Sequence, residues 1–89
     1  MTLYRICTED KPNLADLVSA RFEAFTIFHG VGYWRGVAEK SATIEIVLES
    51  EKRSQVLELA ETIRRENHQE AVLVQAIELN SVLVEANNG

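Results

Sequence analysis

The sequence predicts an α+β fold in which two helices cover one face of an antiparallel sheet. Two segments carry helical stripes of apolar residues, and four others show the alternation or the short apolar run that is typical of strands. They follow one another in the order β-α-β-β-α-β, which is the order of the ferredoxin-like sandwich. A chain of 89 residues is short enough to form a single domain. We expect this domain over residues 1–86 and a frayed tail over residues 87–89.

The first half of the chain predicts a strand, a helix and a second strand. Residues 3–8 alternate between two sides and end at a turn-rich segment, residues 9–13. An apolar stripe at helical spacing then predicts a helix that runs on to Phe25, with Asn13 as its N-cap. The stripe consists of Leu14, Leu17, Val18, Phe22 and Phe25. Residues 26–28 lead in extended conformation into a glycine-rich stretch.

The second half predicts a strand, a helix and a final strand. Residues 41–49 alternate, with Ala42, Ile44, Ile46 and Leu48 on one side. Ser50 is placed to cap a helix whose apolar stripe is Val56, Leu59, Ala60 and Ile63. Residues 71–79 are apolar enough to predict a buried strand rather than an edge strand. Residues 82–84 are a candidate for a short fifth strand.

Composition excludes several classes of function. The formal net charge of -5 opposes broad attraction to a phosphate backbone, so we expect no duplex nucleic acid partner. The sequence shows neither a signal peptide nor an apolar run of membrane-spanning length, which predicts a cytoplasmic protein without a membrane partner. Cys7 is the only cysteine, so no intrachain disulfide can stabilise so small a domain. Self-association is the remaining means, and the sheet face without helices predicts a trimer or a dimer.

The segment over residues 29–39 differs most from ordinary scaffold sequence. It holds three of the four glycines, the only tryptophan, a tyrosine, a histidine and an arginine. Glycine lets the backbone approach a ligand closely, and Tyr and Trp offer flat apolar surfaces with a polar edge. We expect this segment to be a strand or twisted ribbon interrupted by a bulge. Its composition favours binding over bond-making.

The candidate ligand-binding residues lie mostly in this segment. They are His29, Gly30, Gly32, Tyr33, Trp34, Arg35, Gly36, Glu39, Lys40 and Arg21. The aromatic pair offers either a stacking surface for a planar ligand or a subunit contact. The cationic side chains would neutralise an anion, and Arg35 is the best candidate among them. Glu39 would accept hydrogen bonds from a ligand or hold the turn through a salt bridge.

No residue pattern predicts a metal site, a cofactor or a catalytic group. His29, His68 and Cys7 lack the short spacings of metal ligands. Neither a nucleophile with a base nor a carboxylate pair with separated environments can be identified. Cys7 falls in a predicted strand, where an inert thiol is the usual finding. We therefore expect a protein that is not an enzyme.

Two resemblances rest on the glycine-rich stretch and the segments after it. The run over residues 30–36, then Glu39 and the strand over residues 42–48, resembles CutA and the wider PII-like group. A bacterial and phage family of uncharacterised function is closer in spacing. The matches are Phe25-Thr26, Gly30-x-Gly32-x-Trp34, Glu39-x-Ser41 and Asn67-x-Gln69-Glu70-x-Val72. The resemblance to PII-like proteins implies a trimer that binds a small ligand, often a nucleotide, between subunits. The long modifiable loop of the PII signalling proteins is absent between the second and third strands, so nitrogen signalling is not expected.

Two functions are therefore consistent with the sequence. The first is a homo-oligomeric binder of a small anionic, nucleotide-like molecule, acting as a sensor or as a sponge that sequesters a signal. The alternative is an interaction or inhibitor module that docks on another protein through residues 29–39.

Overall fold

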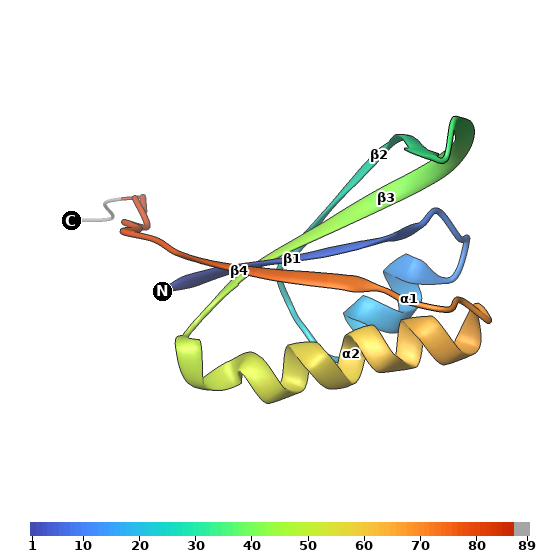
Figure 1. Cartoon of the computed structure of the whole chain (residues 1–89). Helices are drawn as coiled ribbons and strands as arrows, with labels where there is room; N and C mark the ends of the chain where they lie inside the picture. Colours follow the sequence, from blue (N-terminus) through green and yellow to red (C-terminus); the bar gives the residue numbers. More distant parts are fainter. Residues whose placement is uncertain (87–89) are drawn as a thin grey trace.

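The computed structural model describes residues 1–86, which form a four-stranded antiparallel sheet and two helices (Figure 1). The expected tail, residues 87–89, lies outside the described residues. The elements are β1 (Thr2–Glu9), α1 (Leu14–Ser19), β2 (Thr26–Trp34), β3 (Val37–Leu48), a 3₁₀ turn (Ser50–Lys52), α2 (Arg53–Glu66) and β4 (Leu73–Glu78). The strand order is β2-β3-β1-β4. The predicted ferredoxin-like α+β fold is confirmed.

The core lies between the sheet and the two helices, which cover the same face (Figure 1). Alternate residues of β1 and β3 point into it, as the strand period requires. The predicted stripe of α2 is buried in full. The buried apolar residues are Tyr4, Ile6, Leu14, Val18, Phe22, Ala42, Ile44, Ile46, Val56, Leu59, Ala60 and Ile63.

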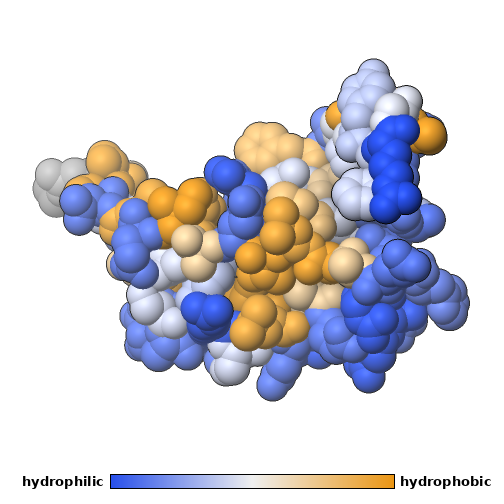
Figure 2. All heavy atoms as spheres, in the orientation of Figure 1, coloured by the Kyte–Doolittle hydropathy of each residue, from blue (hydrophilic) through white to orange (hydrophobic). Residues whose placement is uncertain are grey.

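No helix within residues 1–86 covers the opposite face of the sheet, here called the open face. Its side chains alternate with those of the core and include both polar and large apolar residues. They are Leu3, Arg5, Cys7, Phe28, Thr43, Glu45, Val47, Leu73, Gln75 and Ile77. Figure 2 shows hydrophobic side chains gathered over β4 and again on the projecting C-terminal segment. Residues 1–86 thus leave apolar surface of the sheet without a cover.

The first helix is shorter than the apolar spacing predicts. It ends at Ser19, because the chain must then cross to β2 at the far edge of the sheet. Phe22 is nevertheless buried, and its N–H donates to the C=O of Val18 at 2.9 Å. Asn13 stands at the predicted N-cap position, but its side chain makes no cap hydrogen bond.

The last strand and the segment after it also differ from expectation. β4 is an edge strand rather than a buried one, because it stands last in the strand order. Its apolar residues are divided between the core side and the open face. Residues 82–84 form no fifth strand, because the sheet has already ended beside them. Ser50 does not cap α2. Its hydroxyl lies 2.7 Å from that of Thr2 and donates to Glu78 at 3.2 Å, which ties β1 and β4 to the start of the 3₁₀ turn.

The glycine-rich segment forms a regular hairpin without the predicted bulge. β2 pairs residue by residue with β3, from Thr26 opposite Glu45 to Trp34 opposite Val37. The reversal is made by Arg35 and Gly36, whose φ angles are 49° and 79°. Positive φ at both central residues is the property of the type I′ turn, whose twist matches that of the flanking strands.

Substitution at Gly36 should therefore be costly for a conformational reason. A Cβ at Gly36 would meet no atom within 4 Å, but the residue would have to keep its positive φ. We expect Gly36→Ala to lower the free energy of unfolding by about 1–2 kcal/mol, measured by urea denaturation. Gly30→Ala is the matched control, because its Cβ would lie at an ordinary 3.7 Å from the Ser41 hydroxyl. Equal effects of the two changes would contradict this explanation.

None of the helices in the described residues is both long and apolar enough to cross a membrane.

Candidate functional site

The end of the β2–β3 hairpin projects beyond the rest of the sheet (Figure 1). β1 pairs with β3 only as far as Glu9 opposite Ser41, so residues 31–40 continue as a two-stranded hairpin. This projecting hairpin carries Tyr33 and Trp34, which are 74% and 66% exposed. A two-stranded hairpin is marginally stable alone and exposes large side chains on both faces. It is therefore available for a ligand or a partner.

A groove of about 600 Å³ runs between the projecting hairpin, the end of β1 and the turn that joins α2 to β4. This volume lies in the usual range for sites that bind small molecules. The lining residues are Cys7, Thr8, Glu9, Gly32, Tyr33, Trp34, Glu39, Lys40, Ser41, His68, Gln69, Glu70 and Ala71. The groove thus joins the glycine-aromatic segment to two stretches distant from it in sequence.

Gln69 holds the α2–β4 turn against β1. Its side chain is buried, and its amide exchanges two hydrogen bonds with the Thr8 hydroxyl, at 3.0 and 2.8 Å. The amide oxygen also accepts from the backbone N–H of Glu9 at 3.2 Å. This N–H lies beyond the end of the β1–β4 ladder, whose last pair is Cys7 with Leu73. The Gln69 amide oxygen therefore supplies the acceptor that a β4 residue would provide if the ladder continued. These hydrogen bonds fix one wall of the groove.

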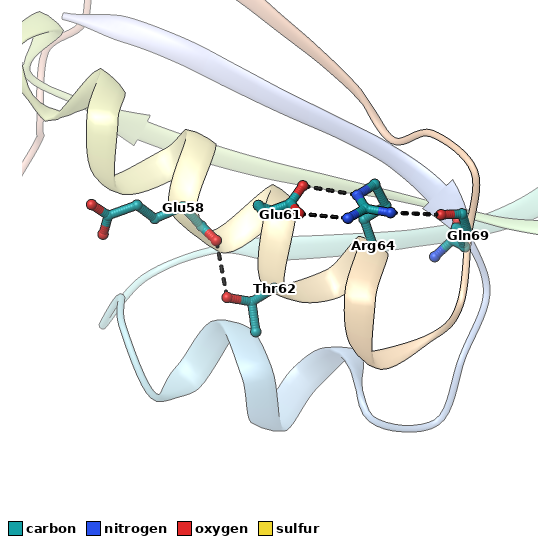
Figure 3. Close-up of polar contacts among 5 residues, drawn as sticks. All are labelled: Glu58, Glu61, Thr62, Arg64 and Gln69. Atoms are coloured by element: carbon teal, nitrogen blue, oxygen red, sulfur yellow. Dashed lines mark hydrogen bonds and ion pairs between the residues drawn. The ribbon is translucent and has the colours of Figure 1, made fainter.

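Arg64 supports the same turn from the helix side (Figure 3). Its guanidinium donates to both carboxylate oxygens of Glu61, at 2.8 and 2.6 Å, and to the C=O of Gln69 at 3.3 Å. The hydrogen bonds from Arg64 lower the pKa of Glu61, and those to Glu61 raise the pKa of Arg64. His68, at the bend of the turn, has a φ of 54°. Gln69 is thus held through both its side chain and its carbonyl group, and its neighbours His68 and Glu70 line the groove.

The groove is lined by more acidic than basic side chains. Glu9, Glu39 and Glu70 contribute carboxylates, and Lys40 contributes an ammonium group. Glu9 has a cationic neighbour in Lys11, at 3.5 Å. Within residues 1–86, Glu39 and Glu70 form no ion pair, so their charges are available to a ligand.

Five of the ten residues predicted for the site line the groove. They are Gly32, Tyr33, Trp34, Glu39 and Lys40. Arg35 lies next to it in the turn, with its guanidinium carbon 5.4 Å from the centre of the Trp34 ring. A cation over an indole face is attractive, so Arg35 holds the tryptophan as well as carrying a charge.

The other four predicted residues do not line the groove. The Nδ1 of His29 lies 2.9 Å from a carboxylate oxygen of Asp10. Arg21 is bound to α2, through Glu58 at 3.5 Å and Thr62 at 3.2 Å. Gly36 serves the turn, and Gly30 stands opposite Ser41 in the ladder.

The sequence prediction missed the wall formed by β1 and residues 68–71. Spacing could not place these residues beside the hairpin, since they meet it only through the tertiary fold. The available signal was the Asn67-x-Gln69-Glu70 pattern, which contains both the buried amide and the exposed carboxylate. Among the described residues, no group of three or more His, Cys, Asp or Glu side chains is arranged to hold a metal ion.

Comparison with known proteins shows the fold and no family. No protein-family model matches the sequence, and no curated protein matches it. A DUF3240 family protein from Shewanella baltica OS155 has a similar structure, with a TM-score of 0.75, 10% identity and 96% of each chain covered. A phage SAM lyase in its apo state has a TM-score of 0.57 and 23% identity, over 98% of this chain and 92% of the lyase. The de novo designed protein Foldit4 has a TM-score of 0.50 and 12% identity, over 89% and 96% of the two chains.

These similarities join natural and designed proteins of one architecture at low identity. Because function resides in sites rather than in folds, the shared architecture assigns no activity to this chain. The chain has the ferredoxin-like fold of these small proteins.

Proposed function

We propose that this protein is a self-associating binder of a small nucleotide-like molecule, which it holds in the groove beside the projecting hairpin. The observation that carries the proposal is the groove itself. It combines an exposed indole, unpaired carboxylates and a volume of about 600 Å³ in one place. Every nucleic-acid base has a flat face that can stack on an exposed aromatic side chain, so Trp34 is the proposed stacking surface.

The charges at the groove indicate how the ligand would lie. Lys40 in the groove and Arg35 beside it would bind an anionic group, as a phosphate or carboxylate requires. Glu39 and Glu70 would repel a ligand that carries only negative charge and would attract an ammonium or another cationic group. We therefore propose a ring-bearing molecule with an anionic group near the hairpin turn and a positive group toward the α2–β4 turn.

Self-association is part of this proposal. The open face and the projecting hairpin carry large apolar side chains that stay exposed within residues 1–86. Larger exposed apolar patches commonly mark interaction sites in small domains. The uncovered sheet face is consistent with a trimer or a dimer, and the resemblance to PII-like proteins supports a trimer with the ligand close to a subunit boundary.

Calorimetry against a small-molecule panel tests the binding proposal. The panel contains adenosine mononucleotides, dinucleotides, cyclic nucleotides and SAM, whose sulfonium and amino groups add positive charge to an adenosine. We expect Trp34→Ala to lose about 1–3 kcal/mol of binding free energy, or about five- to 150-fold in affinity. Arg35→Ala should weaken binding about ten-fold and leave oligomeric mass and melting temperature unchanged.

Arg65→Ala is the matched control for charge. Arg65 lies exposed in the last turn of α2, and it does not line the groove. Its removal should leave affinity unchanged. If Arg65→Ala and Arg35→Ala weaken binding equally, the effect is one of overall charge and the site is misplaced. If no member of the panel binds, the proposal fails.

The proposal assigns binding without bond cleavage, and the same samples test this part. A ligand recovered unchanged after denaturation of the protein would support a sensor or a sponge. The phage SAM lyase shares only the fold, but its name makes SAM the substrate to examine first. Breakdown of SAM by the purified chain, monitored by mass spectrometry, would replace the binder with an enzyme.

A second candidate function is docking on another protein through the projecting hairpin. The observation that favours it is the exposure of Val31, Tyr33, Trp34 and Val37, each above 60%. Aromatic anchors of this kind are enriched at interface hot spots. If the small-molecule panel gives no heat and a Trp34→Ala, Val37→Ser variant loses a partner that wild type retains, this candidate replaces the first.

A further inference from the structure

The C-terminal arm, residues 81–86, carries the most exposed apolar side chains in the described part of the chain. Val82, Leu83 and Val84 are 88%, 81% and 89% exposed. The arm and the projecting hairpin extend from opposite ends of the molecule, whose longest dimension is 53 Å against 24 Å for the next (Figure 1). Exposure of three consecutive apolar side chains to water costs free energy, so we expect a surface to cover the arm.

The arm leaves the sheet at a point where no strand within residues 1–86 lies beside it. Glu78 pairs with Thr2, and Thr2 pairs with Leu48 at the end of β3. The N–H of Leu79 still donates to the C=O of Met1, at 2.9 Å. The β1–β4 ladder ends at this point, and within residues 1–86 no strand pairs with the backbone after Leu79.

The open face of the same molecule has the matching character. Leu3 stands in register between Val47 on β3 and Ile77 on β4, and these three side chains form an apolar row at the arm's end of the sheet. Val47 and Ile77 are 44% and 43% exposed. The adjacent row contains Arg5 and Glu45, which pair with each other at 2.9 Å. The charges on this face are therefore satisfied within the chain, and the apolar row needs an apolar partner.

We propose that residues 82–84 of one copy of this chain pack on the apolar row formed by Leu3, Val47 and Ile77 of a second copy. Each chain carries both the exposed arm, which is the donor segment, and the apolar row, which is the acceptor surface. Two copies can therefore exchange arms, and this reciprocal exchange closes the assembly. The inference rests on the self-association in the proposed function, and it is independent of the ligand. The arm contributes apolar side chains, and it can also add main-chain hydrogen bonds at an open strand edge of the partner.

Substitution of the arm tests the proposal in the full-length chain. We expect Val82→Ser, Leu83→Ser and Val84→Ser together to raise the dissociation constant of the oligomer at least about ten-fold, measured by sedimentation velocity over a concentration series. The circular dichroism spectrum and melting temperature of the monomer should remain those of the folded chain, since the three side chains are more than 80% exposed. Leu57→Ser is the control, because Leu57 is an exposed leucine on α2, away from the open face. It should leave the oligomeric mass unchanged.

A mixing experiment separates arm exchange from other contacts. Val47→Lys with Ile77→Lys should disrupt the acceptor face and also raise the dissociation constant of the oligomer. In a mixture, the face variant supplies an intact arm and the arm variant supplies an intact face. One of the two reciprocal contacts can then form, so the mixture should contain a mixed oligomer that neither variant forms alone.

Three results would overturn the proposal. These are a wild-type chain that stays near 10.0 kDa at high concentration, an arm variant with unchanged mass and dissociation constant, and an arm variant that only lowers the melting temperature of a monomer. The last result would mean that the arm folds back on its own sheet. Ligand binding is measured separately on the same variants. A silent small-molecule panel combined with arm-dependent assembly would defeat the proposed ligand and leave this interface standing.

Discussion

Leu59→Ala should lower the free energy of unfolding by about 2–5 kcal/mol, the range observed when a buried leucine is cut back to alanine. Leu59 is 0% exposed and packs from α2 into the core beneath β1 and β3. The loss combines the transfer of the missing methyl groups with the cavity left behind. For a domain of this size, such a change is a large share of the total stability. Urea denaturation followed by circular dichroism measures it.

Leu57→Ala is a closely matched control for this experiment. It makes the same chemical change two residues away on the same helix, where the side chain is 44% exposed. Leucine and alanine have similar helix propensities, so burial is the main difference between the two variants. We expect the control to lose less than about 1 kcal/mol. Equal losses at the two positions would mean that α2 turns a different face to the sheet.

Gln69→Leu should cost about 1–3 kcal/mol, because it leaves the Thr8 hydroxyl and the Glu9 N–H without their partner. The change keeps a side chain of similar size in the same buried place. It should also weaken ligand binding, since the α2–β4 turn that carries Glu70 would lose its attachment to β1. Denaturation and calorimetry on the same sample measure the two effects.

A double variant separates the hydrogen bonds from packing. In Thr8→Val with Gln69→Leu both members of the side-chain pair are apolar, so most of the loss should be recovered, and the unpaired Glu9 N–H accounts for the rest. Gln55→Leu, at an exposed position of α2, is the control and should change stability by less than about 0.5 kcal/mol. A double variant as unstable as the sum of the single changes would show that packing, rather than the hydrogen bonds, sets the cost.

Local periodicity was sufficient to predict the core. The stripe of α2 and the inward side of β3 are buried as their spacing indicates, because each pattern is complete within one element. Phe22 also lies in the core, although the helix that was expected to carry it ends at Ser19. The burial of an apolar side chain is thus easier to predict than the backbone conformation that places it in the core.

The edge position of β4 and half of the groove could not be predicted in this way. The apolar residues of β4 face the core on one side and the open face on the other, and spacing alone cannot distinguish this from a central strand. Thr8 and Gln69 are 61 residues apart in sequence and meet only when β1 and the α2–β4 turn come together. The hairpin half of the groove was identified from its glycine and aromatic content, since that signal is local.

The position of β1 at the centre of the sheet has a consequence for how the protein is made. Within this sheet β1 is the first strand to be synthesised, and it needs β3 on one side and β4 on the other. Of the four strands, β4 is synthesised last. Until then, the edge of β1 that will receive Leu73–Glu78 stays open, and the loop closure that joins residues 2–7 to residues 73–78 spans most of the chain. Pairings of long sequence separation form slowly, and open strand edges favour wrong pairings in the meantime. Nascent chains on neighbouring ribosomes would expose the same unpaired β1 edge, so high rates of synthesis should favour misassembly of this protein unless chaperones shield that strand.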